Sequence, residues 1–454
     1  MTSMDWLRGK RASRACGIKA LATIQVGIRS LPYLPGCRKR FPISDFHCDP
    51  IQHFHHPRFF PGKPRLSVDT LSIDKSAPMS LRRPATVAEL CDIVKQARAA
   101  KQGVYPVGGL TTLDVGLPTL KPGVAVDMTA MNLVIDYPAR DMTITVQSGI
   151  TIAGLQAVLA KEGQWLPIDV ATPELATLGG AIALNQSGPR RYGYGTLRDY
   201  VIGISFVTDD GVEVKAGGRV VKNVAGYDMM KLQIGAVGTL GVVTQVTLKV
   251  KPKPETSAAV VFGCDAASIG AVLDVVHNSK SRPVAVELLN AAAWRAGGVN
   301  PLVASEWILA VGFEEKAATV AWQQASLLDE LKAVQARGVT EVASATGLWA
   351  AITGLQLRHD SRYIRKLSVL PSKVAEEVVK LPAGLVHAHA LSGVIWVHGE
   401  SSVEGALIRR CPTEAKKSLP VWGKPTPDWE LMRHVKKTLD PDNVFNPGRL
   451  FGNV

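Results

Sequence analysis

The stretch PVGGLTTLD, residues 106–114, places two glycines and two threonines directly after the short apolar run GVY. The run predicts a strand, and the glycines after it predict a turn. In such a loop, successive backbone N–H groups can converge on an anion, and the hydroxyls of Thr111 and Thr112 add donors. Glycine-rich loops of this kind also occur as ordinary turns that bind no ligand. Whether this loop binds an anion must therefore be judged from the rest of the chain.

Two further glycine clusters follow, ATLGGAIALNQSGPRRYGYG at 176–195 and KNVAGYDMMKLQIGAVGTLG at 222–241. Glycine inside a core element costs stability, so three clusters indicate positive φ or close backbone approach. The chain lacks a G-x-G-x-x-G motif followed by an acid about twenty residues later, and it lacks a GKS or GKT loop. These absences exclude a Rossmann site and a P-loop site.

Composition favours a globular protein of two or three domains. The 454 residues are 46% hydrophobic and 20% charged, and no run of about 18 apolar residues predicts a direct membrane span. Residues 1–65 contribute +9 of the net charge of +13, which argues against nucleic-acid binding by the remainder. Six dispersed cysteines form no C-x-x-C pair, which predicts reduced thiols and a cytoplasmic location, with any membrane association through partner subunits.

Four segments differ in pattern. Residues 1–77 read as a basic leader, for which three interpretations stay open: a flexible segment, a start site placed too far upstream of Met79, or a targeting peptide. Residues 78–255 alternate helical and strand-like runs, beginning with a helix that Thr86 and Glu89 cap. They include a hairpin with an Asp-Gly turn at 210–211. Residues 256–420 form a second α+β region with antiparallel strands, and residues 421–454 are a helix with a turn-rich tail.

In their order along the chain, the clusters resemble the FAD-binding domain of the vanillyl-alcohol-oxidase/PCMH flavoprotein superfamily. Within it, the resemblance is to the FAD-binding subunits of bacterial glycolate oxidase, the GlcE-like proteins. The motifs that carry it are PVGGLT at 106–111, TLGG at 177–180, SGPRRYGYGTLRDYVIG at 187–203, GGRVVKNVAGYD at 217–228, GTLGVVT at 238–244 and FNPGRL at 445–450. The resemblance implies an α+β fold, with a two-subdomain FAD domain at 78–255, an α+β cap or substrate domain with an antiparallel sheet at 256–420, and a tail that returns to the FAD domain.

The resemblance also implies FAD as cofactor, with the flavin lying against bare backbone near Gly238 and Gly241. Asp228 is expected to cap a short helix, and Met229, Leu232 and Ile234 to form the core beneath the cofactor. The residues expected to bind FAD are Pro106, Val107, Gly108, Gly109, Leu110, Thr111, Thr112, Thr177, Leu178, Gly179, Gly180, Ser187, Gly188, Lys222, Asn223, Gly226, Tyr227, Asp228, Gly238, Thr239, Leu240, Gly241, Val242 and Val243.

Two positions depart from the family pattern. Leu110 stands where the first loop often has a third glycine, and Ala236 where a serine is common. Covalent flavin attachment in this superfamily uses His or Cys, and residues 57–276 contain no His and only Cys91 and Cys264. We therefore expect FAD to be bound non-covalently.

The resemblance implies oxidation of a small-molecule 2-hydroxy acid, with hydride transfer to flavin N5. Arg190, Arg191 and Arg449 are candidates for binding the substrate carboxylate, because a guanidinium can bind it with two parallel hydrogen bonds. Arg365, Lys366 and His389 are the candidate catalytic residues. His387 and His389 share one face of a strand, as metal ligands could, but HAHALSGV lacks the Asp and Asn of the family's metal motif, and we expect no metal.

Three functional hypotheses stay open. The first is the FAD subunit of a glycolate (2-hydroxy acid) dehydrogenase complex, with a larger flavin subunit and an iron–sulfur subunit as partners. The second is an assembly or electron-relay subunit without its own catalytic site, which the degenerate histidine motif supports. The third is a self-sufficient FAD-dependent hydroxy-acid dehydrogenase.

Overall fold

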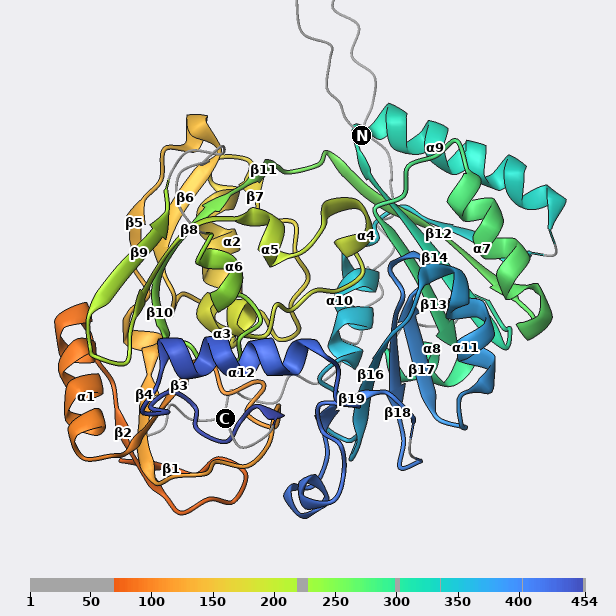
Figure 1. Ribbon diagram of the computed structural model, residues 1–454. Coiled ribbons are helices and arrows are strands. Elements are labelled where there is room, and N and C mark those ends of the chain that lie inside the picture. Colours follow the sequence, from red (N-terminus) through yellow and green to blue (C-terminus); the bar gives the residue numbers. More distant parts are fainter. Residues whose placement is uncertain (1–68, 219–227, 299–302, 335, 402, 452–454) are drawn as a thin grey trace, which may run out of the picture. The chain divides into compact units, whose positions relative to one another are not determined.

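The computed structural model describes residues 69–218, 228–298, 303–334, 336–401 and 403–451 (Figure 1). These residues form a mixed α+β fold, as expected, and it contains three main sheets. Lys222, Asn223, Gly226 and Tyr227, expected to bind FAD, lie outside the described residues. None of the described helices has the length and apolar character needed to cross a membrane.

The first sheet has four strands in the order β1-β2-β4-β3. β3 and β4 run parallel, with Tyr105 opposite Ala125. Helix α1 begins after Thr86, whose side chain accepts the N–H of Glu89, so the expected helix is confirmed. The elements are β1 (Thr70–Leu71), β2 (Met79–Arg82), α1 (Val87–Ala99), β3 (Gly103–Val107) and β4 (Gly123–Asp127).

The second sheet has five strands in the order β5-β6-β10-β8-β9, all antiparallel. The expected hairpin is confirmed: β8 and β9 pair across a turn in which Gly211 has φ of 73°. The strands and the helices between them are β5 (Val134–Asp136), β6 (Thr143–Gln147), α2 (Ile152–Ala160), α3 (Leu178–Ala183), α4 (Arg191–Tyr194), α5 (Leu197–Tyr200), β8 (Val201–Val207), β9 (Glu213–Gly217), α6 (Met230–Gln233) and β10 (Val242–Lys249). A separate two-stranded pair joins β7 (Gln164–Trp165) to β11 (Lys251–Pro252).

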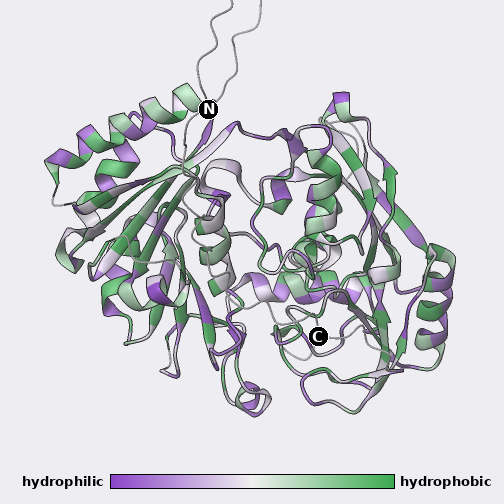
Figure 2. Ribbon diagram, turned by 180° about the vertical axis from the view of Figure 1, so that it is seen from behind, coloured by the Kyte–Doolittle hydropathy of each residue, from purple (hydrophilic) through white to green (hydrophobic). Residues whose placement is uncertain are grey.

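The third sheet has eight antiparallel strands in the order β15-β12-β14-β13-β17-β18-β16-β19. Helices α7, α9 and α11 pack on one face through residues such as Val272, Leu327 and Val378, and α8 and α10 cover the other face with Trp294 and Trp349. Hydrophobic and hydrophilic residues alternate along these helices (Figure 2). The elements are β12 (Thr256–Cys264), α7 (Ile269–Asn278), β13 (Ala285–Asn290), α8 (Ala291–Ala296), β14 (Trp307–Glu315), α9 (Ala317–Glu330), β15 (Arg337–Val342), α10 (Thr346–Leu355), β16 (Ile364–Ser368), α11 (Val374–Lys380), β17 (Leu385–His389), β18 (Val394–His398) and β19 (Leu407–Arg410).

The C-terminal segment returns to the first sheet. After α12 (Asp428–Leu439), Phe445 forms a parallel bridge with Val104 of β3, and the N–H of Asn446 donates to the carbonyl of Val104 at 3.0 Å. The side-chain amide of Asn446 donates to the carbonyl of Val237 at 2.8 Å. The tail therefore joins the strand that precedes the first glycine cluster to the loop that carries the third.

Candidate active site

Parts of the three glycine clusters converge at the end of β3. A side chain at Gly108 would place its Cβ 2.2 Å from Oγ1 of Thr177, and one at Gly109 would lie 1.7 Å from the carbonyl oxygen of Leu175. Gly238, with φ of 64°, packs against Pro106 and Asn446. These contacts leave no room for a Cβ at Gly108 or Gly109, so the loops touch through bare backbone.

The loop after β3 presents unused hydrogen-bond donors. Within the described chain, the backbone N–H groups of residues 109–112 donate to no acceptor, and the hydroxyls of Thr111 and Thr112 also have no partner. Leu110 has φ of 59°, the left-handed conformation that glycine adopts without cost. Successive N–H groups around a left-handed residue form a concave anion site, so this loop, the donor cradle, fits a phosphate group.

Several of the other expected cofactor residues have structural roles. Thr177 caps α3, and Thr239 is fully buried and bonds to the carbonyl of Ala236. Gly241 is required by packing, because a Cβ there would lie 2.8 Å from Phe206. Asp228 accepts the N–H of Lys231 at 3.3 Å, at the start of α6. Leu178, Gly179 and Gly180 belong to α3, Ser187 and Gly188 follow it, and Val242 and Val243 begin β10.

One expectation about the third cluster was wrong. Leu232 is 38% exposed and is not core. The helix that carries it, α6, has only four residues, and it buries Met230 and Gln233. Ile234, just after the helix, is buried as expected.

A pocket lies beside the loop that follows α3. Asn185, which lines it, has φ of 45°, and its buried side-chain oxygen has no partner within the described residues. Asn185 lies next to Gly235 of the third glycine cluster: a side chain at Gly235 would place its Cβ 3.7 Å from the Cβ of Asn185. The polar side chains that line the pocket come from separate elements: Asn185, Gln186, Ser187, Gln356, Lys366, His389, Trp396 and Arg409.

His389 and Glu287 form a buried acid–imidazole pair at this pocket. Nδ1 of His389 lies 2.8 Å and 2.9 Å from the two carboxyl oxygens of Glu287, and both side chains are almost fully buried. The amide nitrogen of Gln356 donates to the carbonyl of Ser187 at 3.1 Å and lies 3.3 Å from Nε2 of His389. A donor at Nε2 requires a lone pair there, so the ring proton is on Nδ1 and faces Glu287.

Burial shifts the pKa of both members of this pair. It raises the pKa of Glu287 well above its usual range, and the charge of Asp169 acts in the same direction, whereas the Arg191 guanidinium lowers it. Burial, helped by the charges of Arg191 and Lys366, lowers the pKa of His389 to about 3. A lasting imidazolium is therefore disfavoured, and a proton arriving at the pair is best held by the carboxyl group.

The pocket also holds cations that have no acidic partner. Lys366 and Arg409, which line the pocket, make no hydrogen bond or ion pair with the described residues. Arg191 is bonded to Oγ of the lining residue Ser187 at 3.1 Å, and its charge acts on Glu287. Burial and then the charges of Arg409 and Arg191 lower the pKa of Lys366 to about 8, and burial lowers the pKa of Arg409 to about 10. Charges left unpaired at a pocket fit an anionic ligand.

Three other candidate residues lie outside this pocket. Arg365 and Lys366 are neighbours on β16, so their side chains point to opposite faces of the sheet. Arg365 bonds to the carbonyls of Gly399 and Glu400. Arg190 is paired with Asp169 and Glu314, and Arg449 with Asp74 and three carbonyls of the loop at 113–117. The donors of these arginines are thus bound by the protein.

His387 and His398 form a buried row with His389. His387 stacks on Trp396, with ring centroids 6.0 Å apart, and neither of its ring nitrogens has a partner within the described residues. Nδ1 of His398 and Oγ of Ser361 form a hydrogen bond at 2.9 Å. The described part of the chain contains no group of three His, Cys, Asp or Glu side chains arranged to hold a metal ion.

Comparison with known proteins identifies the domain that carries the donor cradle. Residues 78–217 match the model of the FAD binding domain, and residues 422–450 match that of the C-terminal domain of FAD linked oxidases. The chain carries an FAD-binding domain of the PCMH type. FAD is its cofactor, and the cradle at 109–112 together with the glycines packed around it fits the dinucleotide's phosphates.

Relatives of the FAD-binding domain include 2-hydroxy acid dehydrogenases. Glycolate oxidase subunit GlcD of Bacillus subtilis (strain 168) is 32% identical over 50% of this chain and 49% of its own length, so the match spans about half of that protein. Glycolate oxidase subunit GlcE of Escherichia coli (strain K12) is 35% identical over 37% of this chain and 48% of its own length. D-2-hydroxyglutarate dehydrogenase of Xanthomonas citri pv. viticola is 25% identical over 82% of this chain and 89% of its own length.

A solved structure shares the fold of this chain. An alkyldihydroxyacetonephosphate synthase superposes with a TM-score of 0.60 at 20% identity, covering 82% of this chain and 76% of its own. At this identity the likeness shows the fold alone.

The sequence did not lead us to four residues of the candidate site: Glu287, which pairs with His389, and Gln356, Arg409 and Asn185, which line the pocket. Glu287 left a signal, because it is the single charge in the apolar strand VAVELLN. The other three lie in ordinary contexts, and only the folding of α3, α10 and β19 around one pocket distinguishes them.

Proposed function

We propose that the chain oxidises a 2-hydroxy acid in the pocket beside the FAD-binding loops. The observation that carries the proposal is the Glu287–His389 pair. Nδ1 of His389 faces Glu287, and Nε2, which the Gln356 amide contacts, lies at a pocket that Lys366 and Arg409 also line. Oxidation of a 2-hydroxy acid needs a base for the hydroxyl proton, a cation for the carboxylate and a hydride acceptor. FAD, when bound, supplies the hydride acceptor.

In this proposal Lys366 and Arg409 bind the carboxylate and thereby orient the hydroxyl toward His389. This step needs Glu287 to begin as a carboxylate, which the charge of Arg191 favours. The substrate hydroxyl takes the place of the Gln356 amide at Nε2 of His389, Nε2 accepts the hydroxyl proton, and the Nδ1 proton moves to Glu287. After both transfers the imidazole is neutral again and Glu287 is protonated. Because burial raises the pKa of Glu287 and lowers that of His389, the pair takes up one proton without leaving a charged imidazole in the core.

Within this class, we propose glycolate oxidase as the setting, with this chain as its FAD subunit beside a larger flavin subunit and an iron–sulfur subunit. The relatives GlcD and GlcE are named as subunits of glycolate oxidase, which supports this setting. The base and the unpaired cations disfavour an assembly subunit without a catalytic site, because such a subunit has no use for them. We also propose that FAD is held without a covalent bond, since the cradle consists of backbone and hydroxyl donors.

Anaerobic titration of the purified, FAD-loaded chain tests the proposal. Glycolate, D-lactate and D-2-hydroxyglutarate are added separately, and we expect one of them to bleach the flavin absorbance. Dithionite serves as the control that the flavin can be reduced. If dithionite bleaches the flavin and no 2-hydroxy acid does, even with the partner subunits added, the proposal is wrong. Bleaching by the chain alone would favour a self-sufficient enzyme over an obligate subunit.

A further inference from the structure

The guanidinium of Arg449 holds the loop that follows the donor cradle. It donates to the carbonyls of Leu113, Val115 and Leu117, the last at 2.8 Å, and it pairs with Asp74. The side chain is 5% exposed, so these bonds are screened little by water. A single buried cation therefore ties together three alternate carbonyls of one loop.

Backbone bonds reinforce this attachment. The N–H of Leu117 donates to the carbonyl of Arg449 at 3.1 Å, and that of Leu120 to the carbonyl of Pro447 at 2.9 Å. Gly116 cannot carry a side chain, because its Cβ would lie 2.7 Å from the carbonyl oxygen of Arg449. The loop that begins with the free donors at 109–112 is thus held against the C-terminal tail directly after them.

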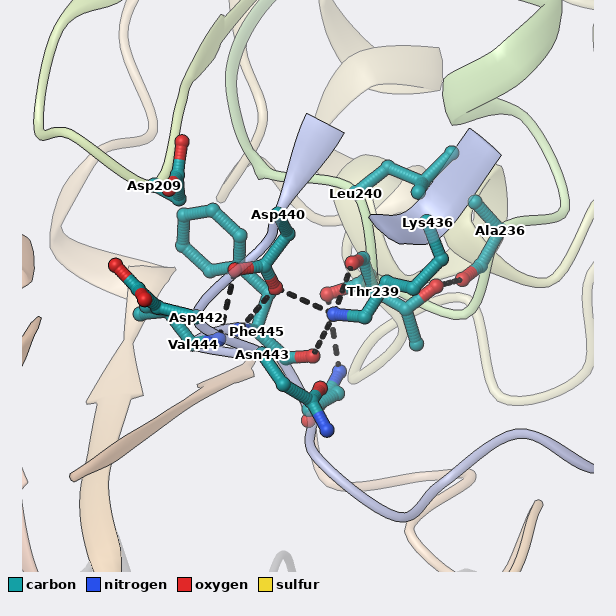
Figure 3. A network of polar contacts seen from close by, with 12 residues as sticks. Asp209, Ala236, Thr239, Leu240, Lys436, Asp440, Asp442, Asn443, Val444 and Phe445 are labelled. Atoms are coloured by element: carbon teal, nitrogen blue, oxygen red, sulfur yellow. Dashed lines mark hydrogen bonds and ion pairs between the residues drawn. The ribbon is translucent and has the colours of Figure 1, made fainter. Parts of the chain in front are cut away.

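A second buried cation of the same segment holds the third glycine cluster. Nζ of Lys436 donates to the carbonyls of Thr239, at 2.8 Å, and Phe445, at 3.0 Å, and pairs with Asp440 (Figure 3). Asp440 in turn accepts the N–H groups of Val444 and Phe445, at 2.7 Å and 2.8 Å. Lys436 is the only residue of α12 that is fully buried, and Trp429 of the same helix stacks on Phe451.

We propose that Arg449 and Lys436 form a C-terminal clasp that positions the two FAD-receiving loops, Arg449 the phosphate cradle and Lys436 the loop at 236–241. Arg449 is then a positioning residue for FAD and does not bind the substrate carboxylate. The physical reason is preorganisation. When the N–H groups already converge, the loop loses less conformational entropy as the phosphates bind. The clasp concerns the cofactor alone, so it stands whether or not the chain oxidises a 2-hydroxy acid.

Ligand binding to the FAD-free full chain tests the Arg449 part of the clasp. Dissociation constants are measured for FAD, for ADP, which carries the pyrophosphate without the flavin, and for riboflavin, which carries the flavin without the pyrophosphate. In Arg449→Lys, the ammonium group keeps the positive charge near Asp74, but it lacks the planar arrangement of donors with which the guanidinium bonds to three carbonyls. We expect ADP and FAD to bind roughly tenfold more weakly, with riboflavin affinity unchanged.

A matched substitution separates positioning from general damage. Lys437→Met removes an exposed cation from the same segment and is expected to change none of the three affinities. Unchanged ADP affinity in folded Arg449→Lys would overturn the proposal. So would an equal loss for ADP and riboflavin, because that pattern indicates general loss of structure. For Lys436→Met we expect weaker FAD and riboflavin binding with ADP affinity retained, and the opposite pattern would contradict the assignment of its loop.

Discussion

The donor cradle and the candidate substrate pocket of this protein are built from different kinds of group. The cradle at 109–112 presents backbone N–H groups from consecutive residues, whereas the pocket presents side chains from elements that are far apart in the chain. Backbone donors are always present and need only the right φ and close packing. Side-chain groups must be brought together by the whole sheet.

The difference determines what each region tolerates. In the cradle, added bulk is harmful because loops pack backbone to backbone, as Gly109 does on Leu175. In the pocket, a change of chemical group matters more than a change of volume, because His389 and Lys366 act through their protons and charge. Substitutions in the two regions should therefore fail in different assays, cofactor binding for one and turnover for the other.

The largest expected effect is on the pocket base. His389→Gln keeps a polar side chain but cannot take up a proton, so we expect flavin reduction by substrate to slow by roughly 10²–10⁴-fold. FAD content should stay normal, because the cradle is untouched. Stopped-flow reduction measures the rate, and His398→Gln, outside this pocket, is the control. Equal losses in both variants would show that the effect is structural and not specific to the base.

The next effect is on the cradle. Gly109→Ala would place a methyl group 1.7 Å from the carbonyl oxygen of Leu175, so the two loops must separate. We expect the protein to purify with little FAD and to gain little thermal stability when FAD is added. Gly270→Ala, in α7, is the control, because its Cβ would meet only the Cβ of Ala375, at an ordinary contact distance of 3.9 Å, and alanine is the better helix former. Full FAD occupancy in Gly109→Ala would contradict the arrangement of the loops.

These two regions also differ in how far the sequence could predict them. The cradle follows from local signals, a strand, glycines and threonines in one stretch, so Gly108, Gly109, Thr111 and Thr112 could be named. The pocket depends on strand register and pairing. The sequence shows that Arg365 and Lys366 are adjacent, but only the pairing of β16 shows that Lys366 is the one that faces His389. Glu287 pairs with His389 because β13 lies beside β17, which no local pattern reveals.

A smaller effect concerns pH. The pKa of Lys366 is lowered to about 8, so its charge, and with it the attraction for a carboxylate, is lost as pH rises through that value. We expect kcat/KM to fall above about pH 8 while kcat at saturating substrate changes little. Lys366→Arg keeps its charge over this range and should remove the dependence. Because the folded chain binds this proton more weakly than the unfolded chain, the contribution of Lys366 to stability increases as pH rises above about 8.

If kcat/KM of the Lys366→Arg variant still falls above pH 8, another group carries the titration. Substrate affinity should be compared by the concentration that half-bleaches the flavin, measured on either side of pH 8. A pH-independent concentration would place the carboxylate elsewhere in the pocket.

The smallest effect tests the left-handed residue of the cradle. Leu110 has φ of 59°, a conformation that costs a residue with a Cβ about 1–2 kcal/mol and costs glycine almost nothing. Both Leu110→Ala and Leu110→Gly lose the contacts of the leucine side chain, but only glycine relieves the strain. We therefore expect Leu110→Gly to be more stable than Leu110→Ala by about 1 kcal/mol in denaturant unfolding.

Elsewhere the order of the two variants should reverse. At Leu133, which is exposed and has no positive φ, glycine costs unfolded-state entropy without relieving strain, so alanine should be the more stable replacement. If alanine were the more stable replacement at position 110 as well as at 133, the cradle would not require a left-handed residue at 110. A reversal at 110 alone would show why glycine suits this loop: the donors converge only when the chain turns through positive φ, and Leu110 pays that cost in exchange for its apolar contacts near Tyr105 and Val107.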